Sequence, residues 1–359
     1  MEILKVFFIK KVFDELKSGF SRSDLGYFLS KLTPRKFLNL LNSYVARKLG
    51  FFFFPPRPVT LFIEIVNGCN FNCVGCQAGT LFKKSFMKFD DFKKILNAFP
   101  DAIFIYPYGV GESFLHRDIY DMIKYAVQKG FIVLPFSNFS VISAEKLVST
   151  GIRKIFASID TFDREKFSLL RSGGNINIVV KNIMKVQEEK KKRNIPYPEI
   201  CINTTIMKEN IDDCEDIILN GLKLGISSFY FQTLFTADFL NPSTHPPDKS
   251  DIQKIKFLKK KYKNKAKIYL ISHYNYEMGD YFFGFCQFAF SALFISSNGE
   301  TYPCICGTTP EKRNGEGIFG NIYKESINSV IYRRTNFLID FRKSVPEWCK
   351  GCPIYYREC

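Results

Sequence analysis

Short apolar runs rich in β-branched residues alternate along the middle of the chain with longer segments whose apolar positions recur every three or four residues. The first pattern is typical of buried strands and the second of amphipathic helices. We expect strands over 61–66, 102–108, 132–136, 154–159, 199–206 and 228–234, with helices over 90–98, 118–129, 143–150, 176–192 and 212–224 between them. Regular alternation of strand and helix predicts an α/β fold with a parallel sheet, here a partial TIM-type (β/α)6 barrel.

The segments on either side of this alternation differ from it. Apolar residues at positions 4, 8, 12 and 16 recur at helical spacing, and Thr33 followed by Pro34 predicts the start of another helix. Prolines at 55, 56 and 58 then break the chain, and 241–250 is rich in Pro, Ser, Thr and His. We therefore expect a helical N-terminal extension over 1–57, the barrel over 58–245 and a small C-terminal domain over 246–359.

The predicted N-terminal helices carry lysines and arginines on their polar faces. They could lie on an anionic membrane, with the four phenylalanines at 51–54 as an apolar wedge. We favour packing against the barrel, because basic amphipathic helices are common on soluble proteins. No run reaches the roughly 18 apolar residues of a membrane-spanning helix. The expected location is the cytoplasm, with peripheral membrane contact as the alternative.

Composition narrows the class of protein. The 359 residues are 46% hydrophobic, which is ample for a large core. The net charge of +16 would suit an anionic partner, but the basic residues are scattered, so nucleic acid is not expected as a partner. Most of the 11 cysteines gather near the two ends of the expected catalytic unit, and no signal peptide precedes them. This favours metal ligation in a reducing compartment over disulfides.

Three cysteines, Cys69, Cys73 and Cys76, follow the first predicted strand in the spacing CxxxCxxC. The C-terminal end of a strand is where an α/β barrel carries its chemistry. Three thiolates can hold three corners of one cluster and leave its fourth position open for a substrate. Zinc is the alternative, but zinc sites usually add a second half nearby, and only His116 stands among the next hundred residues.

The cysteine motif and its position resemble those of the radical S-adenosylmethionine (SAM) enzymes. The resemblance implies that Cys69, Cys73 and Cys76 bind a 4Fe-4S cluster whose fourth iron is chelated by SAM. One departure is Gly75, which stands where the family commonly has an aromatic residue against the adenine. Adenine stacking must therefore come from elsewhere in this chain.

The end of the second predicted strand supplies an independent part of the resemblance. Gly109, Gly111 and Glu112 are similar to the family's Gly-Gly-Glu motif, whose backbone and carboxylate receive the amino group of SAM. Glycines are needed there because a side chain would block close approach to the ligand. The resemblance implies that Glu112 acts together with the three cysteines.

The ends of two later predicted strands extend the resemblance. Ser158 would hydrogen-bond the ribose or carboxylate of SAM, and Arg171 would pair with the carboxylate through its planar fork of donors. Asp160, close to both, is expected to cap the N-terminus of a helix. Ser137 and Asn138 are similar to the family's Thr-Asn-Gly, with Phe139 in place of the glycine.

The C-terminal region resembles the SPASM/Twitch domains that follow the barrel in many of these enzymes. Asn298-Gly299 predicts a tight hairpin turn. Cys306 and Cys359 are too few for a second auxiliary cluster, and a structural zinc ribbon is the alternative. The resemblance implies one auxiliary 4Fe-4S cluster bound by Cys286, Cys304, Cys349 and Cys352.

The activity that the resemblance implies is reductive cleavage of SAM to a 5'-deoxyadenosyl radical, which removes a hydrogen atom from a substrate carbon. An external donor such as flavodoxin or ferredoxin would supply the electron, and the auxiliary cluster would accept one. We favour a radical SAM oxidoreductase or epimerase that acts on a sugar, a cyclitol or a lipid-linked small molecule, because the N-terminal segment is predicted to contain helices only. The alternatives are a peptide maturase and a non-catalytic metal-binding scaffold.

Overall fold

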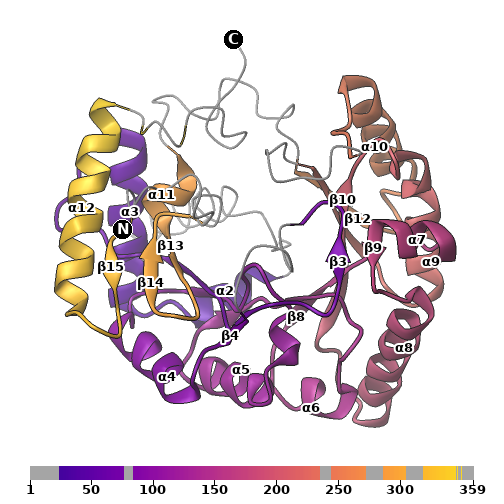
Figure 1. Ribbon diagram of the computed structural model, residues 1–359, viewed down its shortest axis with the longest axis horizontal. Coiled ribbons are helices and arrows are strands. Elements are labelled where there is room, and N and C mark those ends of the chain that lie inside the picture. The colour runs from indigo at the N-terminus through magenta and orange to yellow at the C-terminus, as the bar shows by residue number, and fades with distance from the viewer. Residues whose placement is uncertain are drawn as a thin grey trace.

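The computed structural model describes residues 24–76, 84–234, 244–271, 286–304, 318–344, 346 and 349. Its strands form a curved sheet in two hydrogen-bonded parts, and helices follow the outer side of the curve (Figure 1). In order across the sheet, the first part contains β15 (Gly320–Asn321), β14 (Glu300–Tyr302), β13 (Ala292–Ile295), β1 (Thr60–Ile63), β5 (Phe104–Tyr106) and β6 (Ile132–Val133). The second contains β12 (Lys267–Ile271), β11 (Ser228–Thr233), β10 (Glu199–Ile206), β8 (Lys154–Ser158) and β7 (Phe136–Ser137).

The two parts are joined at the strand predicted over 132–136. Leu134 and Pro135 separate β6 from β7, so that β6 pairs with β5 and β7 pairs with β8, both in parallel. The strands predicted for the six barrel units are all present and parallel to their neighbours. The predicted α/β partial barrel is confirmed.

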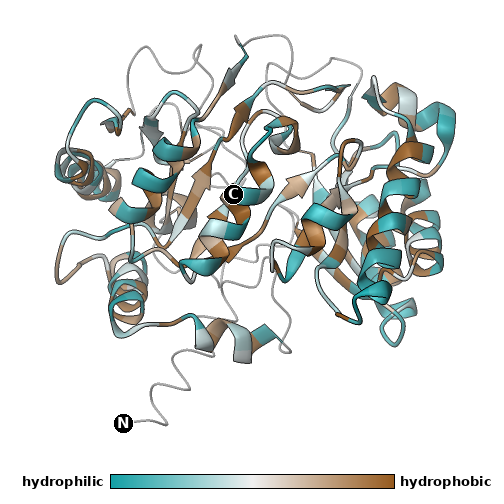
Figure 2. Ribbon diagram, turned by 90° about the horizontal axis from the view of Figure 1, so that it is seen from below, coloured by the Kyte–Doolittle hydropathy of each residue, from teal (hydrophilic) through white to brown (hydrophobic). Residues whose placement is uncertain are grey.

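Amphipathic helices cover the outer face because their apolar residues recur on one side. In α8 (Ile176–Lys192), Ile176, Val179, Ile183 and Val186 are buried, while its last turn carries three lysines. Figure 2 shows the same division of apolar and polar faces around the sheet. The other outer helices are α4 (Phe89–Ala98), α5 (Ile119–Gln128), α6 (Ala144–Val148), α7 (Arg164–Leu170), α9 (Cys214–Lys223) and α10 (Lys249–Lys261).

The N-terminal helices α2 (Leu25–Ser30) and α3 (Pro34–Leu49) pack on the barrel, as favoured from the sequence. Thr33 caps α3 by accepting a hydrogen bond from Lys36 N. Lys36 is itself buried, and its Nζ donates to Gly130 O at 2.8 Å, so at least one of the basic residues serves the fold. The predicted helix around positions 4–16 lies outside the described residues.

The C-terminal elements join the barrel sheet. β12 pairs in parallel with β11, and β13 pairs in parallel with β1. β13 and β14 form the predicted hairpin, in which Gly299 has a φ of 85°. α11 (Gln287–Ser291) precedes β13, and α12 (Ile327–Lys343) follows the hairpin. The domain boundary at 245/246 remains a prediction. Within the described residues, no helix is long and apolar enough to cross a membrane.

Candidate active site

The cysteine loop begins directly after β1 and is held by two short pairs of strands. β2 (Val66–Asn67) pairs with β4 (Ser85–Phe86), and β3 (Asn72–Cys73) pairs with β9 (Arg171–Ser172), so that Cys73 lies opposite Arg171. Cys69 and Cys73 are half-buried and Cys76 is exposed. The structure therefore places the three predicted ligands in one loop at the C-terminal end of β1.

The thiols of this loop would have to lose their protons to bind a metal. Burial raises the pKa of Cys69, and it raises that of Cys73 to about 12, although Arg171 acts in the opposite direction. Metal binding would therefore have to displace protons from these thiols. Among the described residues, no three His, Cys, Asp or Glu side chains converge on one ion position.

Gly109 and Gly111 form a close backbone contact with the cysteine loop. A Cβ atom at Gly111 would lie 2.3 Å from Val66 O and 2.4 Å from Gly68 O. The next residue, Glu112, donates its backbone N–H to Gly68 O at 3.0 Å. Only glycine fits at position 111, because there is no space for a side chain between the two loops.

Glu112 is buried, and the protein itself satisfies its carboxylate. The carboxylate accepts hydrogen bonds from Asn138 N at 2.6 Å, from Ser137 Oγ at 3.0 Å and from Phe114 N at 3.0 Å. Burial raises its pKa, and these hydrogen bonds oppose the shift. The carboxylate thus fastens the loop after β5 to the loop after β7. Its predicted contact with the SAM ammonium group remains a prediction.

The loop after β7 reaches back to the cysteine loop. Asn138 Nδ2 donates to Asn70 Oδ1 at 2.9 Å and lies 3.9 Å from Cys69 Sγ, and Phe71 N donates to the same sulfur at 3.3 Å. Phe139 has a φ of 62°, the left-handed conformation that glycine adopts readily. This explains why the family's motif has glycine at that position, and Phe139 carries a fully buried ring there instead.

Arg171 and Asp160 form a buried pair on the other side of Cys73. Arg171 Nε lies 2.8 Å from Asp160 Oδ2, but it is not aligned for a hydrogen bond with any acceptor. Burial alone would lower the pKa of Arg171, whereas the Asp160 carboxylate raises it and prevails. The predicted role of Asp160 as a helix cap is wrong, because Asp163 caps α7 by accepting from Lys166 N at 2.7 Å. Ser158 is half-buried at the end of β8.

Glu64, at the end of β1, is a residue of this site that sequence reasoning missed. It is 2% exposed and accepts hydrogen bonds from Val110 N at 3.1 Å and from Ser297 N and Oγ at 3.2 and 3.1 Å. A Cβ at Gly109 would lie 2.5 Å from Glu64 Cγ. The carboxylate therefore connects the loop of Gly109 and Gly111 to the C-terminal hairpin. Its one signal in the sequence is an acid within an otherwise apolar run.

The predicted auxiliary ligands are described in part. Cys286 and Cys349 both border a small apolar cluster formed by α3, α11 and α12. Cys304 follows β14 and is half-buried. Cys352, Cys306 and Cys359 lie outside the described residues. The pair at Cys286 and Cys349 is compatible with ligands from one site, and assignment of the full set remains a prediction.

Aromatic side chains contact one another from strand to strand across the sheet. The ring centroids of Phe62 and Tyr106 are 4.9 Å apart, and those of Phe136 and Phe156 are 4.3 Å apart. Tyr230 and Tyr269 stack at 4.5 Å. Tyr230 is 2% exposed, and its Oη has no hydrogen-bond partner. Register places Tyr230 beside Asn203 and Asn203 beside Ser158, so this belt adjoins the predicted SAM contacts.

The fold and the cysteine loop define an α/β partial barrel with three cysteines together at the C-terminal end of its first strand. The radical SAM superfamily model matches residues 63–219, and the model of an iron-sulfur cluster-binding domain, SPASM, matches residues 286–353. The chain therefore belongs to the radical SAM superfamily and carries a C-terminal SPASM domain. The two domains imply 4Fe-4S clusters and SAM as cofactors.

Curated relatives match about half of the chain. A tungsten-containing aldehyde ferredoxin oxidoreductase cofactor-modifying protein from Pyrococcus furiosus is 24% identical over 48% of this chain and 51% of its own length. A GTP 3',8-cyclase from Saccharophagus degradans is 22% identical over 48% of this chain and 53% of its own length. The chain thus spans about half the length of these relatives.

Solved structures share the fold over more of the chain. Streptococcus suis SuiB bound to SAM has a TM-score of 0.63 at 15% identity, covering 96% of this chain and 77% of SuiB. The protein anSMEcpe with bound AdoMet has a TM-score of 0.59 at 16% identity, covering 83% of this chain and 88% of its own. At this identity the likeness shows the fold.

Proposed function

We propose that the protein is a radical SAM oxidoreductase that acts on a carbon atom of a sugar, a cyclitol or a lipid-linked small molecule. The observation that carries this proposal is the contact between the cysteine loop and the glycine loop at 109–112. With both clusters and SAM bound, the site would supply a 5'-deoxyadenosyl radical to remove a hydrogen atom, and an auxiliary cluster to accept an electron. A site that only stored metal would have no need of this close backbone approach.

Some residues around the cysteine loop would hold the cluster, and others would orient SAM. Cys69, Cys73 and Cys76 would hold the SAM-binding cluster. The backbone at Gly109 and Gly111, fixed by Glu64 and Glu112, would receive the amino group of SAM. On the opposite side, Arg171 presents a charge that Asp160 holds in place, and its remaining donors would receive the SAM carboxylate. Beside Arg171, the hydroxyl group of Ser158 would form a further hydrogen bond with SAM.

The aromatic belt supports a ring-shaped or lipid-linked substrate. Aromatic faces bind the apolar faces of sugar or cyclitol rings and also alkyl chains. Most ligand sites combine such apolar walls with a few polar groups that fix orientation. Here the buried hydroxyl of Tyr230 has no partner, and Asn203 lies beside it in the register. A substrate hydroxyl would satisfy the Tyr230 oxygen.

A peptide substrate is the second candidate, and one observation favours it. SuiB has been solved with its precursor peptide SuiA, and anSMEcpe with two peptides. Both share the fold of this chain. Against it, the N-terminal extension forms two helices, α2 and α3, in its described residues 24–57. Maturases of this family often grip a leader peptide with a domain of both strands and helices.

Measurements of bound iron and of SAM cleavage test the reaction class. Protein reconstituted without oxygen should bind about eight irons, as two 4Fe-4S clusters, and the triple variant Cys69→Ala, Cys73→Ala, Cys76→Ala should keep about half. Cys214→Ala removes a buried thiol on the outer helix α9 and should keep them all. With dithionite, the wild type should form 5'-deoxyadenosine and the triple variant none. Protein that binds only zinc would exclude the proposal.

Isotope transfer tests the substrate class. Candidate sugars, cyclitols and peptides carrying deuterium on carbon would be supplied in separate assays. The correct class transfers deuterium to 5'-deoxyadenosine, because the hydrogen atom is taken from the substrate carbon. Transfer from a peptide, with none from the sugars or cyclitols, would establish the maturase instead.

A further inference from the structure

Helix α3 exposes apolar residues and buries polar ones, the reverse of an ordinary surface helix. Its exposed residues Leu38 and Leu49 have 54% and 61% of their surface accessible. The side that packs on the protein contains Leu40 and Ala46, but it also contains four polar residues that are at most 4% exposed: Lys36, Asn39, Asn42 and Ser43. A helix that faces water on its outer side normally has its polar residues there. The outer side of α3 is therefore built for an apolar partner.

Asn42 fixes the segment that follows the helix. Its Nδ2 donates to Phe54 O at 2.9 Å, and its Oδ1 accepts from Phe53 N at 2.8 Å. Phe51, Phe53 and Phe54 are 48%, 69% and 41% exposed, and the rings of Phe51 and Phe53 meet edge to face with centroids 5.5 Å apart. Hydrogen bonds to the backbone thus hold this segment in a shape that presents its rings at the surface.

The exposed leucines and phenylalanines belong to one continuous surface. Leu38, Leu41, Val45 and Leu49 follow one another at intervals of three or four residues, so they form a stripe along α3. Leu49 is the last residue of the helix, so the stripe leads into the three exposed phenylalanines. Together these seven residues form the outer face of α3. Extended apolar surfaces of this kind mark contacts with another protein or with a membrane.

The charge around the outer face of α3 distinguishes between these partners. Residues 25–63 contain six lysines and arginines and no aspartate or glutamate. Asp101 pairs with both Arg35 and Arg57, so that one carboxylate meets two cations. Arg342, exposed in the last turn of α12, lies beside the turn that ends α3. An anionic bilayer binds surfaces that combine inserted apolar side chains with neighbouring cations.

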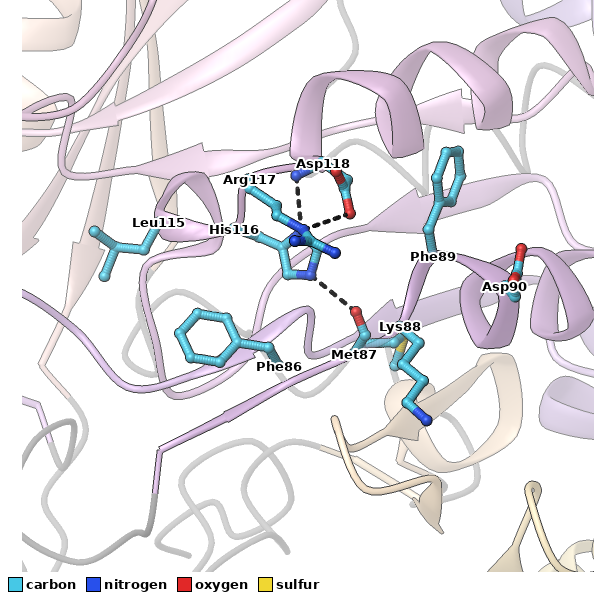
Figure 3. A pocket seen from close by; sticks show the side chains of 9 residues that line it. All are labelled: Phe86, Met87, Lys88, Phe89, Asp90, Leu115, His116, Arg117 and Asp118. Carbon is cyan, nitrogen blue, oxygen red and sulfur yellow. Dashed lines mark hydrogen bonds and ion pairs between the residues drawn. The ribbon is translucent and has the colours of Figure 1, made fainter.

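A groove of about 490 Å³ between β4 and the start of α5 provides a contrast (Figure 3). Phe86 and Leu115 are exposed there as well, at 53% and 36%. The two cations that line the groove are matched by two carboxylates, and Arg117 Nε lies 3.4 Å from Asp118 Oδ2. Apolar exposure in the groove therefore comes without an excess of positive charge, whereas the outer face of α3 combines the two.

The phenylalanine segment also reaches the C-terminal cysteines. Phe52, which lies between the exposed phenylalanines, packs against the small apolar cluster that Cys286 and Cys349 border. Figure 1 shows α3 beside α11 and α12 at one end of the curved sheet. The outer face of α3 therefore adjoins the part of the chain that carries the predicted auxiliary ligands.

We propose that the outer face of α3 lies on an anionic lipid membrane. The helix lies in the plane of the interface, the phenylalanine segment enters the headgroup region, and the inner side of α3 stays on the protein. Among the substrates proposed above, this location favours the lipid-linked one, and that step alone rests on the proposed function. Membrane binding itself needs neither SAM nor radical chemistry, so the surface and the proposed function can fail separately.

The test compares two double substitutions of the same residue types. Leu49→Ser with Phe53→Ser alters the outer face, and Leu219→Ser with Phe257→Ser alters exposed positions of α9 and α10. Phe257 is 63% exposed on a lysine-rich helix, so this control asks whether any apolar residue in basic surroundings is sufficient. Each reconstituted protein is mixed with vesicles of phosphatidylcholine, alone or with an equal amount of phosphatidylglycerol, and the bound fraction is measured by flotation.

The wild type should float with the vesicles that contain phosphatidylglycerol, and this binding should fall as salt rises. The outer-face variant should bind about tenfold more weakly, because two apolar side chains no longer enter the interface. The α9–α10 control should bind as the wild type does. Bound iron and dithionite-driven SAM cleavage without lipid should be equal in all three proteins, since neither pair of residues belongs to the active site.

Phe53→Trp gives a second measurement that does not depend on a loss of binding. The variant keeps an aromatic ring and should still bind the anionic vesicles. Its emission should then shift to shorter wavelengths and be quenched by brominated phosphatidylcholine. The wild type contains Trp348 as its single tryptophan and supplies the background signal. Vesicle binding without any change in the emission of position 53 would exclude this face from the membrane.

Other outcomes would also overturn the proposal. Equal vesicle binding by the outer-face variant and the wild type would place the contact elsewhere, and loss of binding in the control alone would assign it to α10. Self-association of the wild type without lipid, lost in the outer-face variant, would assign the face to a second copy of the chain. If the wild type binds vesicles but fails to cleave SAM with dithionite, the proposed function fails and the membrane surface stands.

Discussion

The buried polar groups on the two sides of the site differ in how far the protein itself satisfies them. In the part that carries β1 and β5, Glu64 and Glu112 each accept three hydrogen bonds from the protein. On the side of β9 and β11, Tyr230 Oη is buried without a hydrogen-bond partner, and Arg171 Nε has only its ion pair with Asp160. On the first side the protein satisfies the buried carboxylates, whereas on the second side buried polar groups could still form hydrogen bonds with a ligand.

This difference separates residues that build the site from residues that receive ligands. A buried polar atom without a partner costs about 1–3 kcal/mol of stability, so folded proteins keep few of them. Those that remain often lie where a ligand completes the hydrogen bonding. We infer that Glu64 and Glu112 position the loops, whereas Arg171 and Tyr230 face SAM and the substrate. Substitutions in the two parts should therefore have different signatures.

The largest effect is expected at Gly111. Gly111→Ala would press a methyl group against Val66 O and Gly68 O, which are backbone atoms and cannot rotate away. Separation of the glycine loop from the cysteine loop should cost about 3 kcal/mol of stability, at the upper end of the cost of overpacking. Thermal unfolding should show a lower midpoint, and the reconstituted protein should retain less of the iron at the first cluster.

Gly26→Ala is the matched control for this change. Gly26 lies in α2, and a Cβ there would meet no atom within 4 Å. Alanine also favours the helix, so stability should stay the same or rise slightly. If Gly111→Ala were as stable as this control and kept its iron, the tight contact between the two loops would not be needed.

A smaller loss is expected from Glu112→Gln. One carboxylate oxygen becomes an NH2 group and must face either Asn138 N or the pair formed by Ser137 Oγ and Phe114 N. Loss of a charge-assisted hydrogen bond should cost about 2 kcal/mol. SAM binding and 5'-deoxyadenosine formation should fall with it.

Ser137→Ala separates the two roles of Glu112. It removes one of the three donors and leaves the carboxylate in place, so it should reduce stability by less and keep SAM binding. Normal SAM affinity in Glu112→Gln at a temperature where the variant is folded would mean that Glu112 only positions the loop.

The sequence was sufficient for most of the elements and for the placement of Cys69, Cys73 and Cys76 in one loop. Local periodicity predicted α8 to the residue, because its apolar positions and its end signals agree. The contacts that complete the site could not be predicted, because they depend on pairing between strands that are far apart in the sequence. Ser297 reaches Glu64 only because β13 adds to β1 in parallel, and no local pattern encodes that pairing.

Errors in the candidate site had the same origin. Asp160 was expected to cap a helix because aspartate before a helix commonly does so. Asp163, three residues later, takes that role, and Asp160 turns to Arg171, which folds back beside it through the pairing of β9 with β3. Phe139 was noted as a departure from glycine, but its left-handed backbone could not be read from the residue type.

The smallest predicted effect, at Tyr230, is also the one that best sharpens the comparison, because its sign is unusual. Tyr230→Phe removes a buried hydroxyl without a partner and should stabilise the protein by about 1 kcal/mol. The same change at Tyr120 should do the reverse, because Tyr120 Oη accepts a hydrogen bond from Ser143 N at 2.7 Å. Tyr230→Phe should also raise the KM for the substrate and leave substrate-free SAM cleavage unchanged, since we infer that the hydroxyl contacts the substrate. Thermal unfolding and steady-state kinetics measure both effects, and a lower unfolding midpoint in Tyr230→Phe would show that the hydroxyl supports the fold after all.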